Sequence, residues 1–160
     1  MYYEWMNLKL DYFIRIDRSV MDIINNYRQS VSNNLPEGCG IIIGEVRNKS
    51  LWVKDISVPC ASDIRSRYQF LRTVDGHQLF LNNLHNISGG YLRYIGEWHT
   101  HPELYPKPSN ADYLGWSVLV ANTEFSSSHK LFWIASSKDY EDDWLQLIFG
   151  GQYYSLSRVK

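Results

Sequence analysis

The sequence predicts one α/β domain built on a mixed sheet, in which strands outnumber helices. Its length of 160 residues suits a single compact domain with a sizeable core. Short segments with period-two alternation or β-branched runs recur along the chain, and segments with helical spacing lie between them. No internal repeat, low-complexity tract or linker interrupts this pattern, so we expect residues 1–160 to form a single domain.

The predicted strands rest on hydrophobic patterns bounded by turn residues. The alternation from Leu8 to Ile16 is typical of a half-buried strand. Cys39–Gly44 is a β-branched run bounded by glycines, which predicts a central strand buried on both faces. The other predicted strands are Leu51–Val58, Tyr91–His99, Leu131–Ala135, Trp144–Phe149 and Tyr153–Val159.

Three segments have the spacing of apolar residues that is typical of helices. Asp17 is placed to cap a helix over residues 20–27. A second helix is predicted over Val74–Leu84. The third is expected to begin at Ser109 and to run to about Ala121, after a loop that contains three prolines.

Composition and charge exclude several classes of protein. The 16 basic and 17 acidic residues leave a net charge of −1, so no global attraction to nucleic acid or to an anionic membrane follows. The N-terminus lacks the features of a signal peptide, and no apolar run is long enough to span a bilayer. Cys39 and Cys60 are too few for a disulfide framework and are expected to be reduced thiols. We therefore expect a cytoplasmic protein with neither a nucleic acid nor a membrane as its partner.

The stretch from His99 to Asp112 carries the residues with the most specific chemistry. His99 and His101 are two apart on a predicted strand, so their imidazoles point to the same face. Pro102 ends ladder pairing directly afterwards, which places the histidines at the end of the strand. Ser109 is suited to cap the next helix, and Asp112 then falls at its third position, where the helix dipole favours a carboxylate.

Two imidazoles and one carboxylate that converge from a strand end and a helix start predict a Zn²⁺ site with three protein ligands. The open fourth position is what a catalytic zinc needs for water. A zinc deaminase would require His-x-Glu and a later Pro-Cys-x-x-Cys, and neither Cys39 nor Cys60 has a neighbouring cysteine. The helical motif His-Glu-x-x-His is also absent. The sequence therefore predicts zinc bound by His99, His101 and Asp112.

The run from His99 to Pro102, followed by Ser109 and Asp112, resembles the JAMM motif of the MPN/JAB metalloprotease family. The match includes the ten residues between His101 and Asp112. The resemblance covers about residues 8–155 and implies the MPN (JAB/Mov34) fold, a mixed curved sheet flanked by about three helices. It also implies a zinc isopeptidase or peptidase that cleaves after the C-terminus of a ubiquitin-like or similarly conjugated protein.

The same resemblance implies a catalytic glutamate upstream of a glycine-rich strand, and Glu37 matches that position. It would take the proton of the attacking water and deliver it to the leaving amine. Two other glutamates remain candidates: Glu97, which shares a strand face with His99 if the strand is regular, and Glu45. Ser109 resembles the family serine that hydrogen-bonds the tetrahedral intermediate, although simple helix capping is an alternative role for it.

Within the family, the chain is similar to the small bacterial JAB peptidases encoded beside E1/E2-like enzymes. It is particularly similar to the deconjugating peptidases of CBASS anti-phage operons. That resemblance implies a protein substrate, either a CBASS nucleotidyltransferase or a ubiquitin-like protein, conjugated through its C-terminal tail by an E1/E2-like enzyme. A catalytically silent MPN scaffold that mediates protein assembly is the alternative.

The segment Ala61–Arg72 mixes basic and aromatic residues. Its cluster of Arg65, Arg67 and Arg72 has two interpretations, a solvated edge or a docking site for an acidic or carboxylate-bearing tail. A strand around Tyr68–Leu71 would present an edge to an extended peptide. Two other histidines, His77 and His85, are interpreted as surface or packing residues and not as ligands, and His129 is expected in a polar turn.

Overall fold

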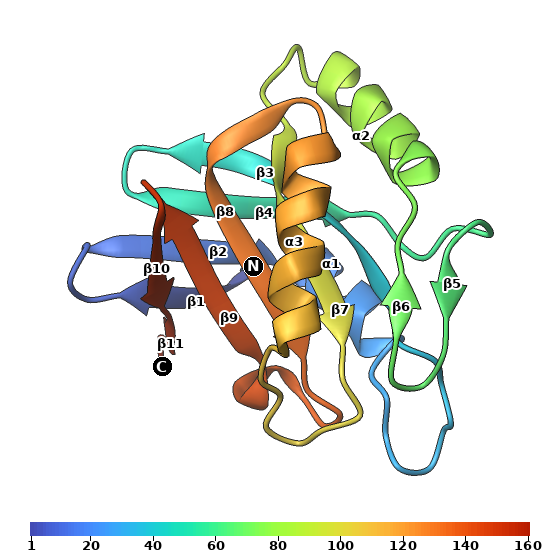
Figure 1. Ribbon diagram of the computed structural model, residues 1–160. Helices are drawn as coiled ribbons and strands as arrows, with labels where there is room; N and C mark the ends of the chain where they lie inside the picture. Colours follow the sequence, from blue (N-terminus) through green and yellow to red (C-terminus); the bar gives the residue numbers. More distant parts are fainter.

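A nine-stranded mixed sheet forms the centre of the molecule, and the computed structural model describes all of residues 1–160 (Figure 1). Its strands are β1 (Tyr2–Asn7), β2 (Tyr12–Asp17), β3 (Cys39–Arg47), β4 (Ser50–Ile56), β7 (Arg93–Thr100), β8 (Ser126–Ala135), β9 (Trp144–Phe149), β10 (Gln152–Ser155) and β11 (Ser157–Arg158). Their order is β10-β9-β8-β7-β3-β4-β2-β1-β11. β2 pairs with β4, and β7 with β8, in parallel, whereas the other pairings are antiparallel. The prediction of an α/β domain with a mixed sheet is confirmed.

Three helices flank the sheet, which is curved: α1 (Arg18–Asn25), α2 (Asp75–Ile87) and α3 (Asn110–Asn122). In Figure 1, α3 crosses in front of the sheet, α2 lies at its upper right and α1 lies behind it. A separate two-stranded hairpin of β5 (Ile64–Arg65) and β6 (Phe70–Leu71) lies beside the lower end of β7, and a short 3₁₀ turn, Tyr140–Asp142, precedes β9. None of the helices has the length and apolar character needed to cross a bilayer.

The strand β3 is buried on both of its faces, as the glycine-bounded run predicts. Ile42 belongs to the large core on the side of α1, where Met21 is also fully buried. Ile41 and Ile43 point the other way and pack with Leu81 of α2. Because both faces are covered, this strand holds the two layers of the domain together.

The prediction of a strand from Leu8 is wrong at its start. Leu8 is 79% exposed and lies in the turn between β1 and β2. Asn7 Oδ1 accepts the amide of Leu10 at 3.0 Å, and Asp11 adopts a positive φ of 49°, both of which favour a tight turn. The alternation of leucines therefore runs through a turn, and the strand begins only at Tyr12.

The predicted strand Tyr153–Val159 is divided into two short strands at opposite edges of the sheet. β10 pairs with β9, so that Tyr153 lies opposite Ile148. β11 pairs with β1, so that Arg158 lies opposite Trp5. The side-chain amide of Asn7 also donates to the carbonyl of Ser155 at 2.8 Å. Seven residues thus connect the two edges of the curved sheet.

A β-bulge interrupts the pairing of β7 with β8 between Tyr94 and Gly96. Gly96 has a φ of 144°, and a Cβ atom at this position would lie 1.7 Å from the carbonyl oxygen of Leu131. Residues other than glycine rarely adopt this φ. The clash would be with the backbone of β8, so the movement of a flexible side chain could not relieve it. The bulge therefore requires glycine.

We expect the substitution Gly96→Ala to prevent folding or to lower the free energy of unfolding by more than about 4 kcal/mol. Gly115→Ala is the matched control, since a Cβ at Gly115 in α3 would meet nothing within 4 Å. It should raise the free energy of unfolding by about 0.5–1 kcal/mol. Urea unfolding of both variants measures the difference, and equal stability of the two would contradict this account of the bulge.

Candidate metal centre

β7 places two histidines at the end of a central strand. His99 lies opposite Cys39 of β3 and Ile134 of β8, so its backbone is paired on both sides. The amide of His101 still donates to Ala135 at 3.2 Å, and the chain then leaves the sheet at Pro102. Both side chains are buried, His99 completely. The prediction that the pair sits where a strand opens into a loop is confirmed by this geometry.

Potential ligand atoms of three residues face one another at the end of β7. The Nε2 atoms of His99 and His101 are 3.0 Å apart; His99 Nε2 lies 3.4 Å from Asp112 Oδ1, and His101 Nε2 lies 3.4 Å from Asp112 Oδ2. Ligand atoms around a tetrahedral zinc with bonds of 2.0–2.1 Å lie roughly 3.4 Å apart. Burial lowers the pKa of His99, which favours the neutral imidazole that a metal requires. The spacing and the donor set therefore fit a bound metal ion.

The start of α3 orients the carboxylate of Asp112. The amide of Ser109 donates to Asp112 Oδ2 at 2.8 Å, and the amide of Asp112 donates to Ser109 Oγ at 3.1 Å, which completes a capping box. Burial would raise the pKa of Asp112, but the interactions with His101 and His99 hold it well below its usual range. Asp112 is therefore an ionised acceptor at neutral pH.

Ser109 is confirmed as the cap of α3. Its Oγ acts there as an acceptor, through a lone pair. The hydroxyl hydrogen is not used by the capping bond, so capping and donation to a substrate oxygen do not compete.

Two aromatic rings fix the orientation of His99. Phe70 of the hairpin lies with its ring centroid 4.9 Å from that of His99, and Trp116 of α3 lies at 5.7 Å. Trp116 is buried against Phe132 of β8. The hairpin and α3 therefore enclose the histidine from two sides.

Glu37 lies just before β3, where the antiparallel pairing of β3 with β7 brings it beside the histidines. It is only 4% exposed. Burial raises its pKa to about 8, His101 opposes the shift, and the charges of Asp112 and Glu103 add to it. None of these influences is a hydrogen bond to the carboxyl group.

The two rival glutamates are placed differently. Glu97 is buried and forms a bidentate ion pair with Arg72, with distances of 2.5 and 3.1 Å. Burial raises the pKa of Glu97 to about 7, while Arg72 opposes the shift. Glu45 lies six residues further along β3 than Cys39, near the far end of the strand, and pairs with the exposed Arg47 at 3.0 Å. The geometry therefore brings Glu37 to the histidines, whereas Glu97 and Glu45 form ion pairs with arginines.

The arginine cluster does not form the free basic patch that either interpretation required. Arg72 is buried in its pair with Glu97. Arg65 Nη1 donates to the carbonyl of Glu37 at 3.2 Å, and Arg67 Nη2 donates to the carbonyl of Ser30 at 3.1 Å. Their guanidinium groups bind main-chain carbonyls of this chain, because those carbonyls lack partners in a regular sheet.

Sequence reasoning missed one fully buried polar side chain near the histidines, that of Gln29. Its Nε2 donates to the carbonyls of Leu35 and Arg67, and its Oε1 accepts from Thr100 Oγ1. A single glutamine after a helix carries no local signal, since its partners come from three distant parts of the chain.

A second group of potential ligands, Cys60, Asp63 and His77, lies at the start of α2. His77 bonds Asp63 at 2.8 Å and Ser57 Oγ at 2.5 Å, and Asp63 also accepts the amides of Cys60 and Thr73. These polar atoms are satisfied by one another, so we interpret the group as a hydrogen-bond network and not as a metal site.

The remaining histidines act through stacking. His85 stacks on Phe125 with centroids 3.9 Å apart. His129 lies in β8 and stacks between Tyr12 and Phe149, so its predicted place in a polar turn is wrong.

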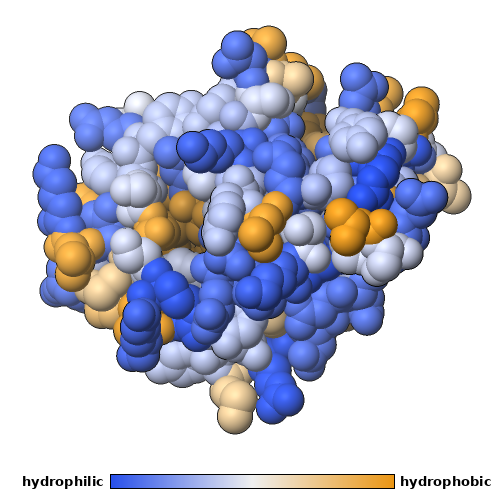
Figure 2. Space-filling model, turned by 90° about the horizontal axis from the view of Figure 1, so that it is seen from below, coloured by the Kyte–Doolittle hydropathy of each residue, from blue (hydrophilic) through white to orange (hydrophobic).

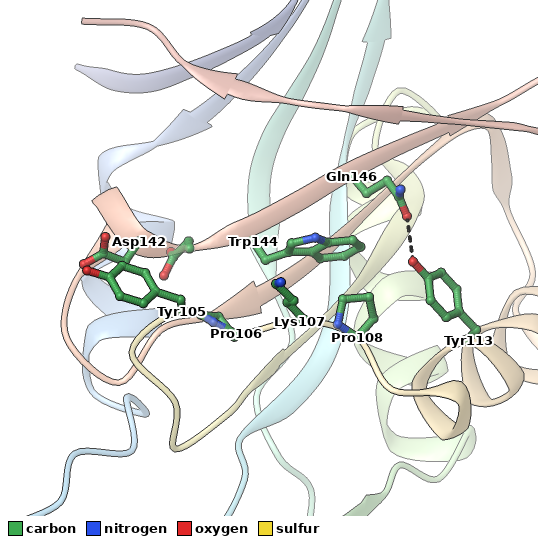
Figure 3. Close-up of a pocket in the computed structure, with 9 residues that line it drawn as sticks. Tyr105, Pro106, Lys107, Pro108, Tyr113, Asp142, Trp144 and Gln146 are labelled. Carbon is green, nitrogen blue, oxygen red and sulfur yellow. Dashed lines mark hydrogen bonds between the residues drawn. The ribbon is translucent and has the colours of Figure 1, made fainter.

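A shallow cavity of about 390 Å³ lies beside the loop that follows His101 (Figure 3). Tyr113 Oη donates to Gln146 Oε1 at 3.5 Å along one wall, and Trp144 forms the back (Figure 3). The lining residues are Tyr105, Pro106, Lys107, Pro108, Tyr113, Asp142, Asp143, Trp144 and Gln146. None of the potential metal ligands is among them, so the cavity is separate from the metal centre.

Comparisons with known proteins agree with this architecture. A family model described as prokaryotic homologs of the JAB domain matches residues 24–147. A protein from Escherichia coli is 38% identical over 114 residues, which are 71% of this chain and 72% of that protein. One from Vibrio cholerae is 37% identical over 130 residues, 81% of this chain and 80% of that protein. Both are named CD-NTase/cGAS isopeptidase. The solution structure of a protein from Desulfitobacterium hafniense has a TM-score of 0.54 at 17% identity and covers 92% of this chain and 90% of that one, a likeness of fold alone.

Proposed function

Because the chain belongs to the family of prokaryotic homologs of the JAB domain, we propose that it is a zinc-dependent isopeptidase. One observation carries the proposal: the ligand atoms of His99, His101 and Asp112 lie 3.0–3.4 Å apart at the end of a central strand. The relatives named CD-NTase/cGAS isopeptidase support a CD-NTase as the conjugated protein. The enzyme would cleave the bond after the C-terminal tail that an E1/E2-like enzyme has attached, in the cytoplasm and as part of anti-phage defence.

The three ligands would hold zinc with one coordination position open. A zinc ion in such a site lowers the pKa of a bound water to about 7 and polarises a carbonyl. Glu37 would accept a proton from the attacking water on a carboxylate oxygen and deliver it to the nitrogen of the leaving amine. Ser109 would donate its hydroxyl hydrogen to the carbonyl oxygen of the scissile bond as negative charge develops there.

The hairpin of β5 and β6 is the best candidate for binding the substrate tail. It is a two-stranded sheet of its own, so its outer edges have unpaired main-chain groups that an extended peptide can bind. Ile64 and Leu71 are more than 60% exposed, and Phe70 of β6 contacts His99. A tail paired with this hairpin would lead toward the histidines.

The end of the molecule that carries the hairpin and the loop after His101 exposes individual apolar side chains, such as Ile64, Leu71 and Leu104, among hydrophilic ones. Figure 2 shows mostly hydrophilic residues there, with hydrophobic ones scattered singly. Such a surface suits a flexible tail better than a large apolar partner. Since Arg65, Arg67 and Arg72 bind groups of this chain, main-chain pairing and not a basic patch would provide the affinity.

We expect about one zinc per chain when the protein is purified without added metal. The double variant His99→Ala/His101→Ala should lose it, whereas His85→Ala should keep it because His85 only stacks on Phe125. Elemental analysis measures the stoichiometry, and a chelator should abolish cleavage. A thiol alkylator should not, since Cys39 is fully buried and neither Cys39 nor the more accessible Cys60 is assigned a nucleophilic role. Unchanged zinc in the double variant would refute the site.

We expect Glu37→Gln to retain fold and zinc but to lose 10²–10⁴-fold in kcat, the usual cost of removing a general acid–base group. Glu97→Gln should act on stability, since it weakens a buried ion pair whose disruption costs about 3–5 kcal/mol, and the folded protein should remain active. Steady-state kinetics at saturating zinc, together with urea unfolding, separates the two effects. An inactive Glu97→Gln beside an active Glu37→Gln would reverse the assignment.

We expect cleavage of a fusion in which the C-terminal tail of a CD-NTase precedes a reporter protein. Mass spectrometry should place the cut after the last residue of the tail, and the rate should fall as the tail is shortened because fewer residues can pair with the hairpin. Equal cutting of an unrelated unfolded protein would indicate a general protease. No cleavage by the zinc-loaded protein would favour the scaffold alternative.

A further inference from the structure

Gln29 joins three segments that meet behind the metal centre. Its side chain is fully buried, and Nε2 donates to the carbonyl of Leu35 at 3.0 Å and to that of Arg67 at 2.7 Å. Its Oε1 accepts from Thr100 Oγ1 at 2.8 Å. Leu35 precedes Glu37, Arg67 lies in the turn of the hairpin, and Thr100 stands between the two histidines. One amide group therefore links all three.

Thr100 extends this connection to the residue after Glu37. Its Oγ1 accepts the amide of Gly38 at 2.9 Å, and its own amide donates to the carbonyl of Gly38 at 3.0 Å. As the neighbour of His99 and His101 in an extended strand, Thr100 points to the face opposite to theirs. β7 thus presents the histidines on one face, while Thr100, whose side chain points to the other face, binds the main chain of Gly38.

The hairpin holds Glu37 from its other side. The amide of Glu37 donates to the carbonyl of Ser66 at 2.8 Å, and Arg65 donates to the carbonyl of Glu37. A Cβ at Gly38 would lie 2.9 Å from Tyr27 Cβ, so there is no spare room around this segment. Since no hydrogen bond acts on the carboxyl group of Glu37, its position depends on the main chain that carries it.

We propose that Gln29 and Thr100 are positioning residues, which hold the carboxyl group of Glu37 at a fixed place relative to the histidines. The inference rests on the proposed function, in which Glu37 moves the proton. Neither residue would touch the substrate: both act through the main chain of Leu35–Gly38. A displacement of about 1 Å in a reacting group can cost 10²-fold in rate.

Gln29→Met and Thr100→Val remove the polar atoms and keep the approximate shape of the side chains. We expect each to lower kcat by 10- to 100-fold while KM and zinc content change less than twofold. Thr100→Ser keeps the hydroxyl and should recover most of the kcat. Thr123→Val is the matched control, a buried threonine whose hydroxyl donates to the carbonyl of Leu119 at the end of α3, and its kcat should not change.

Combination with Glu37→Gln separates positioning from a general structural role. If Gln29 and Thr100 act through Glu37, then Gln29→Met and Thr100→Val should cause no further loss of kcat in the Glu37→Gln background. The same 10- to 100-fold loss in both backgrounds would overturn the proposal. If Gln29→Met does not fold, Thr100→Val carries the test alone.

Hydrogen exchange on the metal-free protein provides a test that does not depend on activity. The amide of Glu37 is bonded to Ser66 and touches neither substituted residue, so its exchange reports how firmly the segment is held. We expect Gln29→Met and Thr100→Val to accelerate its exchange at least tenfold and to leave the amide of Ile42, inside β3, unchanged. Unchanged exchange at Glu37 would refute the positioning role. A wild-type protein that cleaves no conjugate would refute the proposed function alone.

Discussion

The antiparallel pairing of β3 with β7 is the constraint on which the rest of the structure depends. β3 begins directly after Glu37 and β7 ends at the histidines, and the register sets Cys39 opposite His99. Antiparallel pairing brings the start of one strand to the end of the other, so groups 62 residues apart in sequence, such as Gly38 and Thr100, become neighbours. The hydrophobic clusters on both faces of β3 protect this register, since a slip by one residue would exchange Ile42 with Ile41 and Ile43.

Several of the buried polar groups around this pairing are stabilised by specific partners within the chain. Arg72 and Glu97 form a bidentate pair, and Gln29 makes three hydrogen bonds. Leaving any of these atoms without a partner would cost free energy at a buried position, so the networks favour one arrangement of the loops over all others. This explains how a segment with as little regular structure as residues 57–74 is held in place against the sheet.

The local parts of the metal centre could be predicted from the sequence, whereas the non-local parts could not. The two histidines, the proline and the capping box lie in one short stretch, where spacing and helix chemistry suffice. Arg72 looked like a surface charge because its partner Glu97 is 25 residues away. β1 was also missed: its partner β2 follows directly across a tight turn, but its other partner, β11, comes from the opposite end of the chain. The catalytic role of Glu37 stays a prediction, although the register places it at the histidines.

The C-terminal residues determine where other chains can attach to this fold. An unpaired sheet edge is a template for strands from other molecules, and long flat edges lead to aggregation. Here the outermost strands are β10 and β11, of four and two residues, formed by one segment that joins both sides of the curved sheet. Such short edges give a foreign strand little to bind. The strands of the β5–β6 hairpin are as short, but the hairpin exposes Ile64 and Leu71 and lies beside His99, so a strand added there would reach the metal centre. The short edges of the large sheet thus oppose self-association. A strand from another chain would instead add at the hairpin, where Phe70 contacts His99.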